Sequence, residues 1–235
     1  MTKIDIVIPT RNRKDKLAKC LRSAHDVILA SSSYSVIVKI FFSSLQEKDE
    51  FDASYGRCAF VQTHLYAGRF RASTFWNDYL RGMSADALLY LSDDTYLDEN
   101  IINNSAPKIE EFNFDGVVGF KIRNATDGQP AKAAYGLLGS AFADRFPDRK
   151  VFCPDYGAFF CDMELEEFAR CLGRFCFCED AQLEHYHPAF DNSAPDETHL
   201  FHRAEHARSD VSVHEARRAK NILWGKSFEL ILKGA

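Results

Sequence analysis

The sequence has no long apolar run and no apolar leader. Its longest uninterrupted apolar stretches, such as Ala87 to Leu91, cover four or five residues, whereas a helix needs about 20 to cross a bilayer. The first five residues, Met1 to Asp5, lack the apolar core of a signal peptide. We therefore expect a cytoplasmic protein without a membrane span.

Paired cysteines are missing too. The chain has seven cysteines, and the four between Cys161 and Cys178 contain no CxxC pair. Structural zinc sites are usually built from ligands two to four residues apart, so we expect no zinc site here. Reduced and mostly buried thiols are the interpretation that fits this pattern.

The sequence also has no excess of basic residues. Lysine and arginine total 29 against 34 aspartates and glutamates, which gives a net charge of −5. This balance removes the bulk attraction that favours non-specific binding to nucleic acids, although it is compatible with a local basic groove. The hydrophobic fraction of 46% is ordinary for a globular protein, and 235 residues predict one domain or two.

Short apolar runs alternate with helix-like stretches over the first hundred residues. The pattern predicts strands at Ile4–Ile8, Ser35–Phe42, Arg57–Thr63 and Ala87–Leu91, and helices at 14–29 and 70–82. Such alternation is typical of an α/β fold with a doubly wound, mostly parallel sheet. Ligands of these folds bind beyond the carboxyl ends of the strands.

The second half of the chain is less regular. The pattern predicts strands at 116–122, at 152–161 and within 174–187, a loop-rich stretch at 124–150, and a helix at 163–172 ended by Gly173. From Pro195 onward the dense charges indicate one or two exposed helices. On these helices, His199, His202 and His206 are expected to form a solvated face.

Two adjacent carboxylates, Asp93 and Asp94, follow the apolar strand that ends at Leu91. Their repulsion is costly unless a cation neutralises it. Hard oxygen ligands of this kind suit Mg²⁺ or Mn²⁺, which substrate phosphates usually help to hold. The alternative is that both residues cap a helix beginning near Leu97.

The run Ile6–Arg13 resembles the start of the nucleotide-diphospho-sugar transferases of glycosyltransferase family 2, whose fold is called GT-A. In that family the fourth strand ends in a DxD-type motif, and Ser92-Asp93-Asp94 stands at that place. The family also has an Asn on the preceding helix, and Asn77 lies fifteen residues before Ser92. The resemblance implies metal binding by Asp94, and a contact between Asp93 and the sugar or ribose.

A second block, Cys161–Leu165, is similar to the family's acidic motif. Gly173 follows eleven residues after Asp162, and a predicted strand then ends in two histidines, His185 and His187. The resemblance implies that Asp162 is the general base and that one of the histidines binds metal. Both histidines would project from the same side of a strand. The alternative for Asp162 is a residue of the first helical turn.

The resemblance places the nucleotide on four residues at the end of the first strand: Pro9, Thr10, Arg11 and Arg13. Arg71, together with Arg69, is a candidate partner of the diphosphate, because arginine offers two parallel donors to phosphate oxygens. After the second strand the family usually has Asp-Asp-Gly-Ser, which recognises uracil. This chain has Phe42-Ser43-Ser44-Leu45 instead, so the sequence does not identify the nucleotide's base.

These observations predict a metal-dependent inverting glycosyltransferase that moves a sugar from a nucleotide sugar, expected to be a UDP-sugar, to an acceptor hydroxyl. Mn²⁺ or Mg²⁺ would stabilise the leaving diphosphate while Asp162 takes the acceptor proton. The predicted fold is a GT-A-type doubly wound, mostly parallel sheet. We expect the catalytic domain at 1–190 and a C-terminal helical extension packed on it at 191–235.

The acceptor is open among a glycan, a small molecule and a hydroxymethylated base in phage DNA. A DNA base would have to be flipped out of the duplex. Six basic residues near Trp224 could follow the phosphate backbone, although acidic residues are interleaved with them: Arg203, Arg208, Arg217, Arg218, Lys220 and Lys226.

A different class of function is a catalytically inactive module that binds nucleotide sugars. Ser92, Cys161 and the missing uracil motif favour this alternative. A nucleotidyltransferase would need a glycine-rich loop after the first strand, and Pro9–Arg13 contains no glycine.

Overall fold

The computed structural model describes residues 1–56, 58–68, 71–125, 134–188 and 194–220, and the backbone alone of 222–223 and 226–227. Arg69, Trp224 and the side chain of Lys226 lie outside the described residues. In the described part of the chain, no helix combines the length and apolar character that a membrane span requires. All seven cysteines are free, and four of them are buried.

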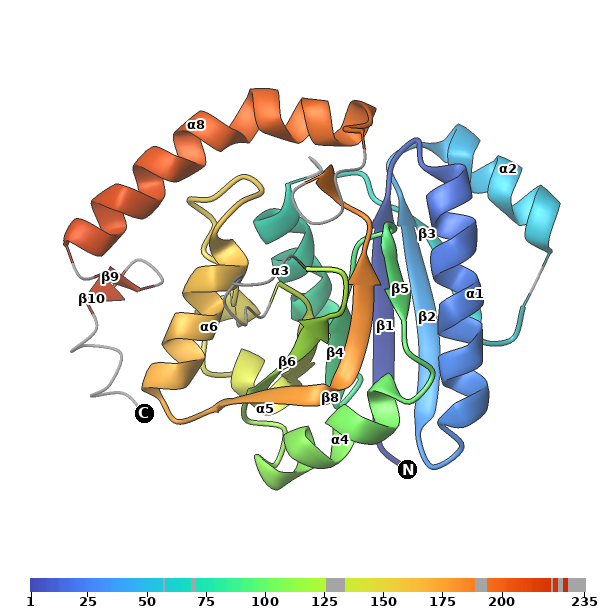
Figure 1. The fold of residues 1–235 in the computed structure, drawn as a ribbon, viewed down its shortest axis with the longest axis horizontal. Helices are drawn as coiled ribbons and strands as arrows, with labels where there is room; N and C mark the ends of the chain where they lie inside the picture. Colours follow the sequence, from blue (N-terminus) through green and yellow to red (C-terminus); the bar gives the residue numbers. More distant parts are fainter. Residues whose placement is uncertain are drawn as a thin grey trace.

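A mixed sheet forms the centre of the molecule (Figure 1). Within the described residues, its strand order is β3-β2-β1-β4-β7-β6-β8-β5. The strands are β1 (Lys3–Thr10), β2 (Ser35–Phe42), β3 (Val61–Leu65), β4 (Ala87–Tyr90), β5 (Thr95–Leu97), β6 (Val117–Ile122), β7 (Gly136–Gly139) and β8 (Phe175–His185). Neighbours among β1 to β4 are parallel, as are β6 and β8, whereas β7 and β5 run antiparallel to their neighbours. The α/β class with a mostly parallel sheet is confirmed.

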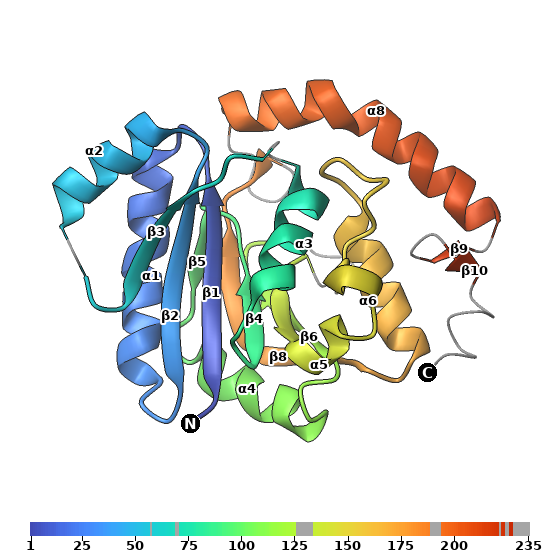
Figure 2. The same ribbon diagram turned by 180° about the vertical axis from the view of Figure 1, so that it is seen from behind.

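Helices cover both faces of the sheet because the strands are apolar on both sides. In β1, Ile4, Ile6 and Ile8 belong to one core and Val7 belongs to the other. The first core is covered by α1 (Lys14–Ala30), α2 (Leu45–Tyr55) and α4 (Ile101–Glu111). The second is covered by α3 (Ala72–Gly82), α5 (Ser140–Ala143) and α6 (Cys161–Cys171), which face the viewer in Figure 2.

Several elements differ from the predictions. The predicted strand at 152–161 is wrong, because this stretch is an irregular loop that leads into α6. The helix α2 was not predicted, and the third strand begins at Val61 rather than Arg57. The predicted loop at 124–150 contains the buried strand β7, whose Gly139 packs so tightly that a Cβ there would lie 1.9 Å from the Phe114 carbonyl oxygen.

The last long helix, α8 (Glu197–Ala219), arches over the carboxyl ends of the strands and over α3 and α6 (Figures 1 and 2). As its charge pattern predicts, most of its charged side chains are exposed, among them Arg203, Glu205, Arg208 and Arg218, but the helix also has a buried side. His206, Asp210 and Arg217 are all buried. The Arg217 guanidinium donates to Asp155 at 3.0 Å and, through two of its nitrogens, to the buried carboxylate of Glu164.

The buried pair between Arg217 and Glu164 generates a stability prediction. Arg217→Met leaves the Glu164 carboxylate buried without its cation, so we expect a loss of about 3–5 kcal/mol in the free energy of unfolding. Arg218→Met is the matched control, because Arg218 meets Glu167 at an exposed position and such pairs contribute about 1 kcal/mol or less. Urea denaturation measures both. Equal losses in the two variants would contradict this account of how α8 is held.

Candidate active site

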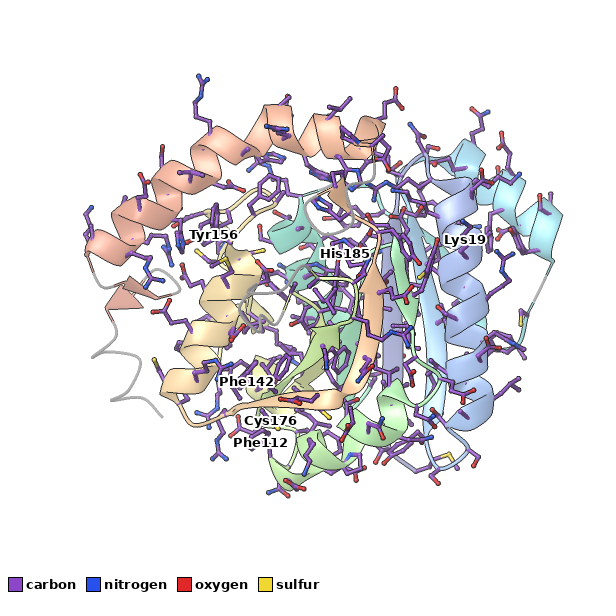
Figure 3. All side chains as sticks on the ribbon, viewed as in Figure 1. Lys19, Phe112, Phe142, Tyr156, Cys176 and His185 are labelled. Carbon is purple, nitrogen blue, oxygen red and sulfur yellow. The ribbon has the colours of Figure 1, made fainter. Side chains whose placement is uncertain are left out.

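A cavity of about 480 Å³ lies at the carboxyl ends of the central strands, beneath α8. It brings together ten residues predicted from the sequence: Pro9, Thr10, Arg11, Arg13, Arg71, Asp93, Asp94, Asp162, His185 and His187. These residues come from the end of β1, the turn after β4, the end of β8 and the starts of α3 and α6. Figure 3 shows His185 under the arch of α8, whereas Phe142 lies toward the opposite end of the molecule.

The adjacent carboxylates Asp93 and Asp94 share one arginine. Arg13 Nη1 lies 2.9 Å from Asp93 Oδ1 and 3.1 Å from Asp94 Oδ2, and the Thr10 hydroxyl donates to Asp93 at 2.8 Å. Both carboxylates are buried, with exposed fractions of 2% and 1%. The Arg13 guanidinium therefore offsets the repulsion between the two carboxylates that the sequence predicts.

Burial and charge affect the two carboxylates differently. Burial raises the pKa of Asp93 above its ordinary value, although Arg13 opposes this shift. Burial also acts to raise the pKa of Asp94, but His185, His199 and Arg13 overcome it and hold that pKa well below the usual range. Asp94 is thus the stable anion of the pair. The proposed helix-capping role of both residues is wrong, because β5 follows them and α4 begins only at Ile101.

His185 is held in place at the end of β8 by its surroundings. Its backbone N–H donates to the Asn124 side chain, and its carbonyl accepts from the same amide, each at 2.9 Å. Its Nε2 atom lies 2.9 Å from the Tyr135 hydroxyl and 3.4 Å from Asp94 Oδ1. Ser92, which stands where the family motif has an acid, donates to the same Asp94 oxygen. The serine therefore orients Asp94 rather than adding a charge.

His199 is a site residue that the sequence reasoning missed. It lies in the first turn of α8, and its Nε2 atom is 3.3 Å from Asp94 Oδ2. Its ring meets the ring of His187 edge to face, with 4.5 Å between the centroids. The prediction of a solvated histidine face is wrong, because His199 and His202 line the cavity and His206 is buried. One signal was available: an acidic residue, Asp196, stands three residues before His199, where a helix would begin.

Two histidines of the cavity, His187 and His202, are kept neutral by their environment. Burial, followed by the charges of His185 and His199, lowers the pKa of His187 to about 4. Burial and the neighbouring His206 lower the pKa of His202 to about 4 as well. Neutral imidazoles can act as hydrogen-bond donors and acceptors and as metal ligands.

Asn77 does not face the cavity, although it was predicted to bind the cofactor. Its side chain donates to the Phe152 carbonyl at 2.6 Å and accepts from the Phe152 N–H at 2.9 Å. Both ends of the amide are thus engaged with one backbone position, and the side chain is buried. Asn77 holds the loop that replaces the predicted strand at 152–161.

The donor atoms fit a metal only in part. Among the described residues, no group of three or more His, Cys, Asp or Glu side chains is arranged to hold a metal ion. Asp94 meets His185 with one oxygen and His199 with the other. Asp94 and His185 are nevertheless ligand types that Mn²⁺ accepts, and such an ion is often held by one or two protein groups plus substrate phosphates. The site therefore fits an ion that arrives with a diphosphate.

The other end of the cavity is aromatic and contains Asp162. Asp162 lies in the first turn of α6. Burial, and after it the charge of Asp162, raises the pKa of Tyr90 well above its usual value. Trp76, Phe152 and Phe160 also line this end. A polar end with arginines and histidines thus adjoins an apolar end with a single carboxylate at its edge.

No protein-family model and no curated protein matches the sequence. Solved structures do match. TarS 1–349 of S. aureus in complex with UDP-GlcNAc has a TM-score of 0.59 and 14% identity, over 86% of this chain and 64% of that chain. The mannosyltransferase PcManGT from Pyrobaculum calidifontis, in complex with GDP-Man and Mn²⁺, has a TM-score of 0.64 and 14% identity, over 98% of this chain and 68% of that one.

The fold is GT-A-like. This confirms the fold expected from the motifs, with α8 as the C-terminal helical segment. The chain spans 61% of the TarS 1–349 structure without ligand, so less than two thirds of that chain has a counterpart in this alignment.

The arginine bridge in this GT-A-like fold generates a second stability prediction. Arg13→Met leaves Asp93 and Asp94 buried without their cation, so we expect a loss of about 3–5 kcal/mol at pH 7. In the variant the pKa of Asp93 rises further above that of the unfolded chain, because Arg13 opposes the effect of burial in the wild type. The deficit is therefore full at neutral pH and shrinks as the pH falls through this raised value.

Chemical denaturation at pH 7.5 and pH 5 measures this deficit. Lys16→Met is the control, because Lys16 forms a partly exposed ion pair with Asp196 and this variant should lose about 1 kcal/mol or less. A deficit of Arg13→Met that is small, or that grows as the pH falls, would contradict the charge bridge.

Proposed function

We propose that this protein is a nucleotide-sugar glycosyltransferase that transfers a sugar to an acceptor hydroxyl. The observation that carries the proposal is the single cavity around which the ten predicted residues gather. The fold supports it, since the matched structures include TarS bound to UDP or UDP-GlcNAc and a mannosyltransferase bound to GDP-Man and Mn²⁺.

The donor would bind at the polar end of the cavity. Pro9, Thr10 and Arg11 at the end of β1 line this end, and Arg13 and Arg71 offer guanidinium groups to the diphosphate. We propose a UDP-sugar as the donor. A comparison of UDP and GDP in binding experiments tests the base.

A divalent cation, Mn²⁺ or Mg²⁺, would be held by Asp94 and His185 together with the donor diphosphate. When bound, such an ion stabilises the negative charge on the leaving nucleoside diphosphate. His187 and His199 stand next to these ligands and orient them. Arg13 already neutralises part of the acidic pair, so the chain contributes positive charge of its own at this place.

Asp162 would act as the general base at the other end of the cavity. The acceptor hydroxyl gives its proton to the Asp162 carboxylate while its oxygen forms a bond to the anomeric carbon. The bond from that carbon to the diphosphate oxygen breaks, and the nucleoside diphosphate leaves with the electron pair. Attack from the face opposite the leaving group inverts the anomeric configuration.

The base assignment predicts a selective loss in Asp162→Asn. General base catalysis typically contributes about 10²–10⁴-fold, so we expect kcat to fall by that order while the affinity for UDP stays unchanged. The assay is release of UDP from a UDP-sugar panel with candidate acceptors. Glu167→Gln, on the exposed side of the same helix, is the matched control. Unchanged turnover in Asp162→Asn would contradict the assignment, and a wild type that binds UDP without turnover would favour the inactive binding module.

The two-ligand cation site predicts that metal and nucleotide bind together. A ligand that binds only the folded state raises its melting temperature. We expect Mn²⁺ and UDP together to raise it by more than the sum of their separate effects, and Asp94→Asn or His185→Ala to remove the excess. Thermal denaturation with each ligand alone and with both measures this. Strictly additive shifts in the wild type would contradict a shared site.

Of the three candidate acceptors, a base in DNA is the one that the ion pairs of α8 disfavour. Arg217 and Arg218, two of the basic residues that could follow a phosphate backbone, are engaged in ion pairs with Glu164, Asp155 and Glu167. A glycan or a small molecule is therefore the acceptor class that we test first.

A further inference from the structure

A carboxylate of α8 holds the loop that leads to Asp162. Asp210 Oδ1 accepts a hydrogen bond from the Gly157 N–H at 2.9 Å, and Oδ2 accepts from the N–H groups of Ala158 at 2.8 Å and Phe159 at 2.9 Å. Asp210 has an exposed fraction of only 1%. Successive backbone N–H groups that converge on one anion form a well-defined anion cradle. Here the anion belongs to the protein itself.

The clamped loop continues directly into the helix of the proposed base. Phe160 follows the three clamped residues with a φ of 67°, in the left-handed region that a bulky residue rarely adopts. The helix α6 begins at the next residue, and Asp162 lies in its first turn. Such a backbone conformation persists only where the surroundings enforce it. Any change in the loop would therefore redirect the first turn of α6.

Other contacts fix the same loop from both sides. The ring of His214 on α8 stacks on the Phe160 ring, with 4.5 Å between centroids and 13° between planes. The Gly157 carbonyl accepts from the N–H of Ala72 at the start of α3 at 3.0 Å. A Cβ at Gly157 would lie 2.3 Å from Nδ1 of His206, so the loop touches α8 without space for a side chain.

We propose that Asp210 is a positioning residue for Asp162, through its clamp on residues 157–159. This inference rests on the proposed function and adds to it a determinant of catalysis on α8. The clamp needs both carboxylate oxygens, because they accept three N–H groups between them. A misplacement of about 1 Å at a reacting group can cost about 10²-fold in rate.

The kinetic experiment uses Asp210→Asn, which keeps the shape of the side chain but replaces one accepting oxygen with an N–H donor. We expect kcat for sugar transfer to fall about 10- to 100-fold, while the donor KM and the affinity for UDP change less than twofold. Glu205→Gln is the matched control, because Glu205 is an exposed acid on the same helix. Ile109→Ala, at a core position of α4, provides a destabilised variant with an intact clamp.

The double variant tests whether Asp210 acts through Asp162. If it does, adding Asp210→Asn to Asp162→Asn lowers the residual rate less than twofold, whereas it lowers the wild-type rate 10- to 100-fold. Amide hydrogen exchange gives a readout without turnover. Exchange in residues 157–163 should accelerate in Asp210→Asn and not in Glu205→Gln.

The outcomes separate this inference from the proposed function. A wild type without transferase activity on any donor would overturn both. An active wild type with an unchanged kcat in Asp210→Asn, unchanged exchange at 157–163, or equal losses in both backgrounds of the double variant would overturn the inference alone. An equal loss of kcat in Ile109→Ala, at a similar melting temperature, would also overturn it, because general destabilisation would then explain the effect.

Discussion

One guanidinium group organises the site. Arg13 donates to Asp93 and Asp94, and its second terminal nitrogen meets Asp196 at the start of α8 at 2.8 Å. Two adjacent carboxylates with almost no exposure could not both stay ionised without a cation beside them. Asp94 remains an anion because His185 and His199, which lie against its two oxygens, together with Arg13 hold its pKa low. The end of β1, the end of β4 and the first turn of α8 therefore depend on one charge.

The parts of the fold that follow from strand geometry could be predicted from the sequence. Runs such as Ile4–Ile8 and Ala87–Leu91 are almost entirely apolar. Strands that are buried on both faces have this pattern, so the sequence alone identifies these runs as central strands. Parallel strands end at the same edge of the sheet, which is why Thr10, Asp93 and His185 meet although they are far apart in the chain. The spacing between Asp162 and Gly173 likewise reflects one helix, α6.

The rest depends on tertiary contacts that leave weak traces in the sequence. Gly136 and Gly139 are the two ends of β7. At both positions neighbouring backbone lies too close for a Cβ, and a local sequence pattern cannot show that. Phe152 was assigned to a strand, but its backbone is bonded to the side chain of Asn77 instead of to a neighbouring strand. The polar pattern of α8 indicates solvent, yet two of its histidines, His199 and His202, line the cavity.

The long-range contacts of α8 have a consequence for the order in which the molecule is made. Arg13 and Asp196 are 183 residues apart, and Asp210 follows the loop that it clamps by about fifty residues. During synthesis the amino-terminal strands and helices emerge first and can form the sheet, but both ends of the cavity gain their final contacts only after α8 has emerged. A nascent chain therefore has the core of the fold for some time before it has an organised active site.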